Sequence, residues 1–381
     1  MQEILSYLES RQTEIRSLIR RLVECESPSD DAAAVDRCVD LAASEAAALG
    51  RVKVKTFPGG KRARHLRIEF ELPGRQKTGQ IMALGHLDTV WPVGTLASMP
   101  YREDGGRIWG PGVFDMKSGV AFCYWAVRAL RDLDLQVNRR LVLMLNSDEE
   151  VGSESSRAFI ENEARKSAAV LVLEPAAGLD GKLKTGRKGV GDFTVTVTGK
   201  PSHAGLDFEA GASAIVELAR QIERIASFTD LKRGITVNPG VISGGTRPNV
   251  VAAEAKALCD FRILRLRDAA RVEKKFRSLK PFDRRCRIAV EGGLNRPPLE
   301  RSAAVLSLYR KAKAIAAGMG LPLGECVVGG GSDGNFTAGL GIPTLDGLGP
   351  VGDGAHAANE HILADRIPDR IALIAGLIRA I

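Results

Sequence analysis

The first 180 residues alternate short apolar runs with longer stretches of helical periodicity. The apolar runs at 80–84, 141–145 and 169–173 have the length of buried strands, and helical stretches lie between them at about 117–130 and 155–163. Apolar strands separated by helices are typical of a mostly parallel sheet that helices cover on both faces. The pattern therefore predicts an α/β domain of this kind.

The middle of the chain follows a different pattern. Residues 193–198 alternate between apolar and polar positions with a period of two, as in a strand with one buried face. The elements expected next are a helix at 211–228, strands at 235–242 and 253–262, a helix at 268–279 and a strand at 287–290. The order strand–helix–strand–strand–helix–strand is that of a ferredoxin-like α+β sandwich.

The first pattern returns near residue 299, with a helix at 302–317 and a closing helix from Pro368. We therefore predict one α/β domain, formed by residues 1–185 and 297–381 and interrupted by an inserted domain at 186–296. The length of 381 residues favours the same division, because it exceeds what one hydrophobic core usually supports.

The first 24 residues carry an apolar stripe interleaved with charges, which predicts an amphipathic helix and not an export signal. No run of about 18 apolar residues occurs, so no membrane-spanning helix and no membrane partner are predicted. The six cysteines stand far apart without a Cys-x-x-Cys pair, as expected of reduced thiols that are mostly in the core. Together these observations predict a cytoplasmic protein.

The composition, with 44% hydrophobic and 26% charged residues, is that of a globular protein and excludes a mainly disordered chain. Lys and Arg number 54 against 46 Asp and Glu, a formal net charge of +8, and they are densest at 61–67 and 262–277. Aromatic residues are only 5% and no stacking motif accompanies the basic runs. We therefore predict a solvated surface there and no nucleic-acid partner. The surplus favours a mild attraction of anionic small substrates.

Polar residues that could carry chemistry follow the three predicted strands. His86 comes directly after the first strand, and the spacing to Asp88 lets a carboxylate orient an imidazole, as around a metal-binding histidine, although a purely structural histidine fits too. Glu149 and Glu150 follow the second strand in a run of three acids, which either cap a helix or are compensated by a cation. Glu174 ends the third strand, as a loop residue or a site residue.

Two more candidates lie in glycine-rich loops. Asp115 precedes a predicted helix, where an aspartate serves as an N-cap or, alternatively, as a carboxylate that bridges two cations. His356 lies in a loop near the C-terminus. Two imidazoles and three carboxylates suit two Zn²⁺ ions with one shared carboxylate, and these five residues are His86, Asp115, Glu150, Glu174 and His356.

Six short motifs occur in an order that is found in a known family. They are Gly85–Val90, Gly110–Gly119, Ser147–Ser153, Leu173–Pro175, Ser202–Gly205 and Gly329–Asp333. The chain thereby resembles the aminoacylase/carboxypeptidase family of dinuclear zinc peptidases, most of all the glutamate carboxypeptidase branch, which removes C-terminal glutamate from folates and related compounds. The resemblance extends from about residue 10 to the C-terminus and includes the inserted domain.

The resemblance implies a division of the metal ligands. His86 and Glu174 would bind one zinc ion, Glu150 and His356 would bind the other, and Asp115 would bridge them, with Co²⁺ or Mn²⁺ as possible replacements for zinc. It also implies a cis peptide bond between Asp115 and Met116.

The resemblance further implies the catalytic roles. Asp88 would hold His86 in place. Glu149 would be the general base that takes a proton from the attacking water and passes it to the leaving amine. His203 in the inserted domain would reach the tetrahedral oxyanion, in dimeric members from the neighbouring subunit. We therefore expect a homodimer that forms through the inserted domain.

Substrate contacts are implied for three further residues. Asn249 and Arg262 would hold a substrate carboxylate, for which a guanidinium is well suited, although a surface salt bridge is the simpler interpretation of Arg262 alone. Gly330 lies in a glycine-rich loop that lacks the lysine of a phosphate-binding loop, so we expect close approach of its backbone to the substrate. His361 is expected at the surface and not at a third metal site.

The predicted activity is zinc-dependent cleavage of an amide or peptide bond that releases a C-terminal amino acid, most simply glutamate or another acidic residue. The substrate would be a small peptide or an N-acyl amino acid. Two alternatives stay open: an N-acyl-amino-acid deacylase of the acetylornithine or succinyl-diaminopimelate type, and a metal-dependent binding protein without catalysis. A binding protein of this kind would be expected to lack a metal ligand or the general base, and the sequence retains all of these residues.

Overall fold

The computed structural model describes residues 1–75 and 77–381. The chain forms two compact units: the first comprises Met1–Gly186, Arg301–Val328 and Ser332–Ile381, and the second comprises Arg187–Glu300 and Gly329–Gly331. Gly329–Gly331 was expected in the first domain. It joins the second unit because the guanidinium of Arg187 donates hydrogen bonds to the carbonyl oxygens of Gly330 at 3.3 Å and Gly331 at 3.0 Å.

The main sheet of the first unit contains, in order across the sheet, β1 (Val52–Phe57), β2 (His65–Phe70), β6 (Arg140–Asn146), β3 (Gln80–His86), β7 (Ser167–Val172) and β14 (Thr344–Leu345). The strands β6, β3, β7 and β14 pair with one another in parallel, whereas β2 pairs antiparallel with both β6 and β1 at one side. The prediction of a mostly parallel sheet is confirmed.

Consecutive side chains of β3 enter two separate hydrophobic cores. Ile81 and Ala83 belong to the core on one face, and Met82 and Leu84 belong to the core on the other. The reason is that successive side chains of a strand point to opposite faces of the sheet. Every residue of β3 is buried, since both faces are covered.

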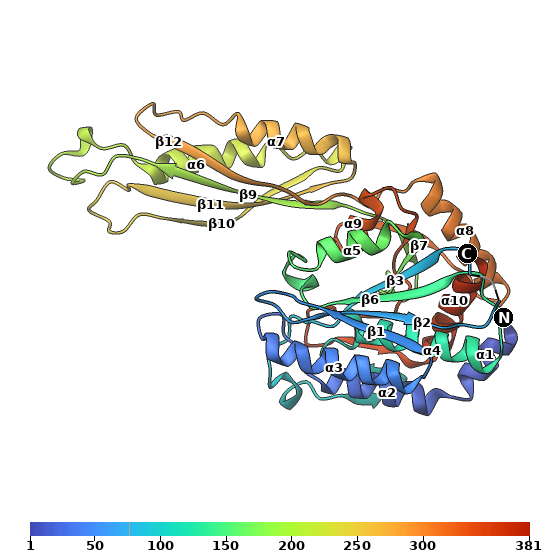
Figure 1. Cartoon of the computed structure of the whole chain (residues 1–381). Coiled ribbons are helices and arrows are strands. Elements are labelled where there is room, and N and C mark those ends of the chain that lie inside the picture. Colours follow the sequence, from blue (N-terminus) through green and yellow to red (C-terminus); the bar gives the residue numbers. More distant parts are fainter. Residues whose placement is uncertain (76) are drawn as a thin grey trace. The chain divides into compact units, whose positions relative to one another are not determined.

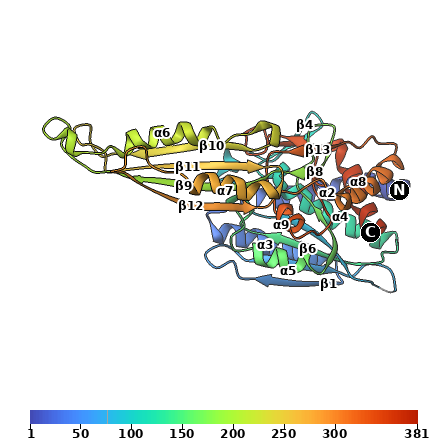
Figure 2. The same cartoon turned by 90° about the horizontal axis from the view of Figure 1, so that it is seen from above.

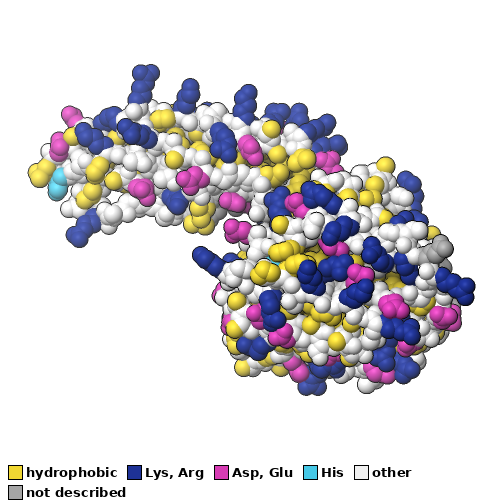
Figure 3. Space-filling model, viewed as in Figure 1, with side chains coloured by type: hydrophobic (Ala, Val, Ile, Leu, Met, Phe, Trp, Pro, Cys, Tyr) yellow, Lys and Arg dark blue, Asp and Glu magenta, His cyan; other side chains and the backbone are white. Residues whose placement is uncertain are grey.

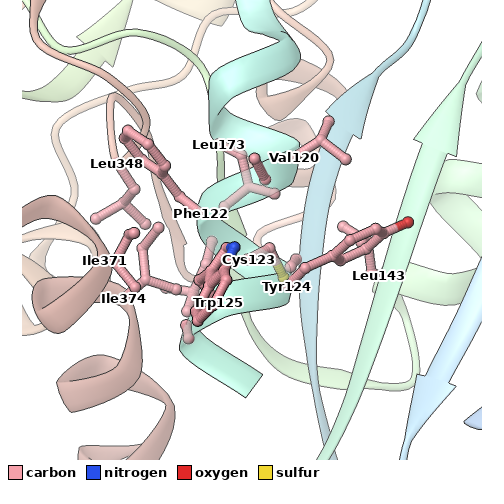
Figure 4. Close-up of a cluster of buried hydrophobic side chains, with 14 of the residues drawn as sticks. Val120, Phe122, Cys123, Tyr124, Trp125, Leu143, Leu173, Leu348, Ile371 and Ile374 are labelled. Carbon is pink, nitrogen blue, oxygen red and sulfur yellow. The ribbon is translucent and has the colours of Figure 1, made fainter. Parts of the chain in front are cut away.

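Helices of the first unit cover the sheet on two sides (Figure 1). One face is covered by α1 (Gln2–Glu9), α2 (Gln12–Glu24), α3 (Ala32–Ala48), α4 (Ser118–Asp132), α8 (Ala303–Ala317) and α10 (Ile367–Ala380), and the other by α5 (Arg157–Ala164) and α9 (Gly334–Gly339). Figure 4 shows side chains of α4 directed to both sides of the helix. Trp125 points toward Ile374 of α10, and Tyr124 points toward Leu143 of the sheet. A helix that is apolar on nearly all sides, as α4 is, belongs in the interior.

Several elements of the first unit were not predicted. The expected single helix at the N-terminus is two helices, α1 and α2, and α3 was missed although the Asp31 side chain caps it by accepting the N–H of Ala34 at 3.0 Å. Two small sheets were also missed. One comprises β15 (Gly352–Asp353), β16 (His361–Leu363), β5 (Arg107–Trp109) and β4 (Arg102–Asp104), and the other comprises β8 (Leu183–Arg187) and β13 (Glu325–Val328).

The second unit has the predicted ferredoxin-like order. Its antiparallel sheet contains β10 (Thr236–Gly244), β11 (Glu254–Ile263), β9 (Gly189–Thr198) and β12 (Arg287–Arg296), and its helices are α6 (Ala214–Ala226) and α7 (Ala269–Arg277). Both helices lie on the same face of this sheet (Figures 1 and 2). The rings of Phe193 and Phe276 stack between sheet and helices, with centroids 4.2 Å apart.

Cys38, Cys123, Cys259 and Cys286 are buried thiols, as predicted for core cysteines. None of the helices within residues 1–75 and 77–381 is long and apolar enough to cross a lipid bilayer.

Candidate functional site

The carboxyl ends of β3, β6 and β7 bring three predicted ligands to one edge of the main sheet. His86 is the last residue of β3, Glu150 lies in the single turn η3 (Glu149–Val151) after β6, and Glu174 follows β7. These strand ends are neighbours because β3 pairs in parallel with both β6 and β7. The Nε2 atom of His86 is 3.6 Å from a carboxylate oxygen of Glu174.

Asp115 lies between the two predicted histidine ligands. One of its carboxylate oxygens is 3.3 Å from Nε2 of His86, and the other is 3.5 Å from Nε2 of His356. The same nitrogen of His356 is 3.1 Å from Glu150. The five predicted ligands therefore form one continuous series of contacts, with Asp115 at its centre and a different carboxylate at each end.

Irregular backbone presents two members of this series. Asp115 lies in the distorted segment Val113–Lys117 just before α4, and the Asp115–Met116 peptide bond is cis, as the resemblance implied. His356 lies in the turn between β15 and β16 with φ of 60°, a left-handed conformation that residues other than glycine rarely adopt. Local sequence patterns do not predict such geometry.

Three carboxylates around two imidazoles make the site strongly attractive to positive charge. Burial disfavours a charged His86, but hydrogen bonds with Asp115, Asp88 and Glu174 outweigh burial and raise the pKa of His86 well above its ordinary value. Hydrogen bonds with Asp115 and Glu150 raise the pKa of His356 to about 10. Each imidazole is thus stabilised as a cation by its carboxylate neighbours, which is the electrostatic environment that a metal ion also requires.

The donor set fits a divalent cation. One ligand atom each from His86, Asp115 and Glu150 lie within 4.8 Å of one another. Imidazole nitrogen and carboxylate oxygen are ordinary ligands of zinc, and histidine with carboxylate also suits related transition metals. His86, Glu150 and Glu174 are largely buried, whereas about half of the His356 side chain is exposed, so the site is open on the His356 side.

Asp88 connects the end of β3 to the turn after β6. Its backbone carbonyl accepts a hydrogen bond from Nδ1 of His86 at 2.9 Å, which directs the unprotonated Nε2 of a neutral imidazole toward the site. Its fully buried carboxylate accepts the N–H groups of Glu149 at 3.2 Å and Glu150 at 3.1 Å and the hydroxyl of Ser29 at 2.7 Å. Asp88 therefore positions His86 at the end of β3 and Glu150 in the turn after β6.

Glu149 begins the same turn as Glu150 and is half-buried, so the expected base and an expected ligand are adjacent in space as well as in sequence.

Two residues near the site were misjudged or missed in the sequence. His361, expected at the surface, is buried and packs against Trp109 with ring centroids 4.6 Å apart, because β16 pairs with β5 at this position. Glu360, whose carboxylate is buried beside the Asp115 segment, was not singled out at all.

The predicted residues of the second unit do not gather at one place. His203 is exposed, and its Nδ1 accepts the N–H groups of Gly205 and Leu206, each at 3.1 Å, so its Nε2 carries the proton of the neutral ring. Asn249 is close to it, since the Asn249 carbonyl accepts the N–H of Ala204 at 3.0 Å.

Arg262 lies near the other end of the sheet of the second unit. It pairs with Val190 at the start of β9, whereas the His203 loop follows the end of β9 at Thr198. Eight residues of strand separate these positions by about 26 Å. The guanidinium of Arg262 forms an ion pair with Asp260 at 2.9 Å, which is the surface salt bridge considered for it. Gly330 is at the end nearer Arg262, where its carbonyl accepts a hydrogen bond from Arg187.

A family model and curated proteins match this chain in sequence over most of its length. The family model described as "Peptidase family M20/M25/M40" matches residues 82–380. Among curated proteins, carboxypeptidase G2 of Pseudomonas sp. (strain RS-16) is 29% identical over 369 residues, which cover 94% of this chain and 87% of that protein.

Solved structures share the fold of the chain. The aminopeptidase PepT of Bacillus cereus has a TM-score of 0.77 at 22% identity, with 97% of this chain and 98% of that one covered. The YXEP protein of Bacillus subtilis, described as a dinuclear metal binding peptidase from the M20 family, has a TM-score of 0.69 at 15% identity, with 98% of each chain covered.

Proposed function

The chain belongs to peptidase family M20/M25/M40, and from this premise we propose that it is a metallocarboxypeptidase that releases a C-terminal amino acid, preferentially glutamate or another acidic residue. The observation that carries the proposal is the series of contacts Glu174–His86–Asp115–His356–Glu150 at the carboxyl edge of the main sheet. The similarity to carboxypeptidase G2 over nearly the whole chain supports the carboxypeptidase activity.

The series of contacts supports a centre for two metal ions. His86 and Glu174 at one end would hold one ion, Glu150 and His356 at the other end would hold the second, and Asp115 would be shared because its two oxygens face different histidines. Zinc is the proposed metal, with Co²⁺ or Mn²⁺ as replacements. When bound, the ions supply Lewis-acid polarisation of the scissile carbonyl and lower the pKa of the attacking water.

Glu149 is the proposed general base. Its carboxylate takes a proton from the water as the water oxygen attacks the scissile carbonyl carbon, and it then donates this proton to the leaving nitrogen as the C–N bond breaks. The products are a carboxylic acid and a free amino acid, so atoms and protons balance. The position of Glu149 in the same turn as Glu150 supports this role, because Asp88 holds the backbone of both residues.

Oxyanion stabilisation and dimerisation are proposed together. His203 with a protonated Nε2 is suited to donate a hydrogen bond to the oxyanion. His203 and Asn249 lie at one end of the second unit and Arg262 at the other, a separation of about 26 Å that one small substrate cannot span. This separation supports a homodimer in which His203 and Asn249 act on the substrate bound by the neighbouring subunit.

The charge distribution supports an acidic substrate. Residues 187–300 contain 21 Lys and Arg against 13 Asp and Glu, so the whole net charge of +8 lies in the second unit. Figure 3 shows Lys and Arg side chains along the edge of this unit that carries its helices. Such a field attracts an anionic substrate, and Arg262 would exchange its partner Asp260 for the substrate carboxylate.

A substrate panel tests the proposal. The zinc-loaded protein is assayed with N-acyl-glutamate, a folate-like glutamate amide, N-acyl-ornithine and N-succinyl amino acids, and we expect the highest kcat/KM on the glutamate compounds. A preference for ornithine or for succinyl groups would indicate the deacylase activity instead. If both the wild-type protein and Glu149→Gln are inert while each binds zinc, the protein is a binding protein and the enzymatic proposal fails.

A further inference from the structure

Glu360 is a buried carboxylate that accepts four hydrogen bonds beside the proposed metal centre. One oxygen accepts the backbone N–H groups of Phe114 at 2.9 Å and Asp115 at 3.0 Å. The other accepts the N–H of Gly112 at 2.9 Å and the indole N–H of Trp91 at 2.7 Å. The residue is fully buried, and four donors match the capacity of a carboxylate to accept hydrogen bonds.

These hydrogen bonds fix the backbone of residues 112–115, whose conformation is irregular. Gly112 has φ of 71°, and the residues after it depart from helical geometry at Asp115 and Met116. Backbone N–H groups that are buried need partners, and here a charged acceptor from a distant part of the chain provides them. Hydrogen bonds to an ionised acceptor are about twice as strong as those between neutral groups.

The loop that contains Glu360 also contains a proposed ligand, His356. Within this loop, His356 contacts the Asp115 side chain at 3.5 Å, and Glu360 accepts the Asp115 backbone N–H at 3.0 Å. The loop is also fixed to the strand that precedes the Asp115 segment. Directly after Glu360, His361 pairs with Trp109 in the ladder between β16 and β5. Asp115 is therefore held through its backbone and its side chain by one loop.

We propose that Glu360 is a positioning residue of the metal centre, which keeps the Asp115 carboxylate between His86 and His356 and so increases metal affinity without binding metal itself. The inference rests on the metal centre of the proposed function. Outer residues that orient ligands typically contribute 10–100-fold to metal affinity. A residue needed only for folding would contribute to the free energy of unfolding of the metal-free protein and leave the affinity of the folded protein unchanged.

The test compares Glu360→Gln with the matched control Glu217→Gln. Glu217 is also buried, and its carboxylate accepts the backbone N–H groups of Phe282 at 3.0 Å and Asp283 at 2.9 Å, but it lies on α6 in the second unit. Each full-length variant is titrated with Zn²⁺ in competition with a chelating dye, and with Co²⁺ by visible absorption. Hydrogen exchange of the amides of residues 112–115 is measured on the metal-free proteins.

We expect E360Q to bind Zn²⁺ about 10–100-fold more weakly than wild type, to alter the Co²⁺ spectrum and to exchange the amides of residues 112–115 faster. E217Q should match wild type in all three measurements. Wild-type zinc affinity in folded E360Q would overturn the proposal. Should E360Q fail to fold, Glu360→Asp keeps the charge but withdraws the oxygens by one methylene, and the same expectation and the same refutation apply to it.

The two proposals fail separately. A wild-type protein that binds zinc but hydrolyses no amide of the panel would overturn the proposed function and leave the role of Glu360 intact. Equal zinc affinity of E360Q and wild type, together with hydrolysis of glutamate amides, would overturn only the role of Glu360.

Discussion

The carboxylate of Asp88 accepts the backbone N–H of Glu150 at 3.1 Å. Through this hydrogen bond a residue that follows β3 determines where the turn after β6 places a proposed ligand. The backbone carbonyl of Asp88 also accepts a hydrogen bond from Nδ1 of His86 at 2.9 Å. This one residue therefore positions a ligand of each proposed ion.

The first prediction follows from this arrangement. Asp88→Asn places an amide group against N–H donors, and we expect zinc affinity and kcat/KM to fall about 10–100-fold. Ser29→Ala is the control, because it removes only the hydroxyl donor at 2.7 Å and leaves the contacts to His86, Glu149 and Glu150. Zinc competition and steady-state kinetics provide the measurement. Equal effects of the two substitutions would contradict the role of Asp88.

The second prediction separates the proposed base from the neighbouring ligand. Glu149→Gln should lower kcat about 10²–10⁴-fold, the usual contribution of general acid–base catalysis, with zinc content unchanged. Glu150→Gln should instead lose zinc, because Glu150 is in the series of contacts through His356. Metal analysis of both purified proteins together with kinetics distinguishes them. Undiminished kcat in Glu149→Gln would exclude it as the base.

The third prediction tests action across subunits. Chains with His203→Ala and chains with Glu149→Gln are each expected to be nearly inactive. Random mixing should restore about a quarter of the wild-type activity, since half of the dimers are mixed and each mixed dimer has one intact site. The measurement is activity after dissociation and reassociation. No recovery in mixtures that contain mixed dimers would show that His203 acts within its own chain.

The fourth prediction concerns metal removal. Treatment with a chelator should abolish hydrolysis and lower the thermal midpoint of unfolding, because a ligand that binds only the folded state stabilises it by about 2.7 kcal/mol at 100 times its Kd. Return of Zn²⁺ or Co²⁺ should restore both properties. Calorimetry across a zinc titration provides the measurement, and a midpoint that does not depend on zinc concentration would contradict a metal centre in this fold.

The fifth prediction concerns stability against pH, away from the metal centre. Burial raises the pKa of Glu163, but hydrogen bonds from Arg67 at 3.0 Å, Gln80 at 2.9 Å and Lys166 at 3.1 Å outweigh it, so the pKa lies below its ordinary value. A lowered pKa contributes stability above the pKa of the unfolded state, about 4.3, and this stability is lost as the pH falls through the folded pKa.

Glu163→Gln should therefore reduce the free energy of unfolding by about 1–3 kcal/mol at pH 7. The difference from wild type should begin to shrink near pH 4.3, where Glu163 of the unfolded chain becomes protonated, and should be lost as the pH falls through the lower pKa of the folded protein. Urea unfolding at a series of pH values measures this. A difference that is the same at pH 7 and in acid would mean that the charge of Glu163 does not contribute.

The elements that the sequence predicted are those whose burial leaves a local pattern. The strands β3, β6 and β7 are predicted within a few residues because they are apolar along their whole length. β1 was missed although its sequence, VKVKTF, alternates; it lies on an edge of the sheet and none of its residues is buried. The strands of the small sheets have only two to five residues, too few to establish a period.

The sequence by itself determined which side chains follow the central strands, and therefore that His86, Glu150 and Glu174 meet at one edge of a parallel sheet. Only the tertiary structure decided that Asp115 lies between the histidines, that His361 is buried, and that His203 and Arg262 occupy opposite ends of the second unit. Glu360 is the clearest case, because it lies 245 positions from the Asp115 N–H that it accepts. Hydrogen bonds over such separations leave no periodicity in the chain, since their geometry arises only when both segments have packed.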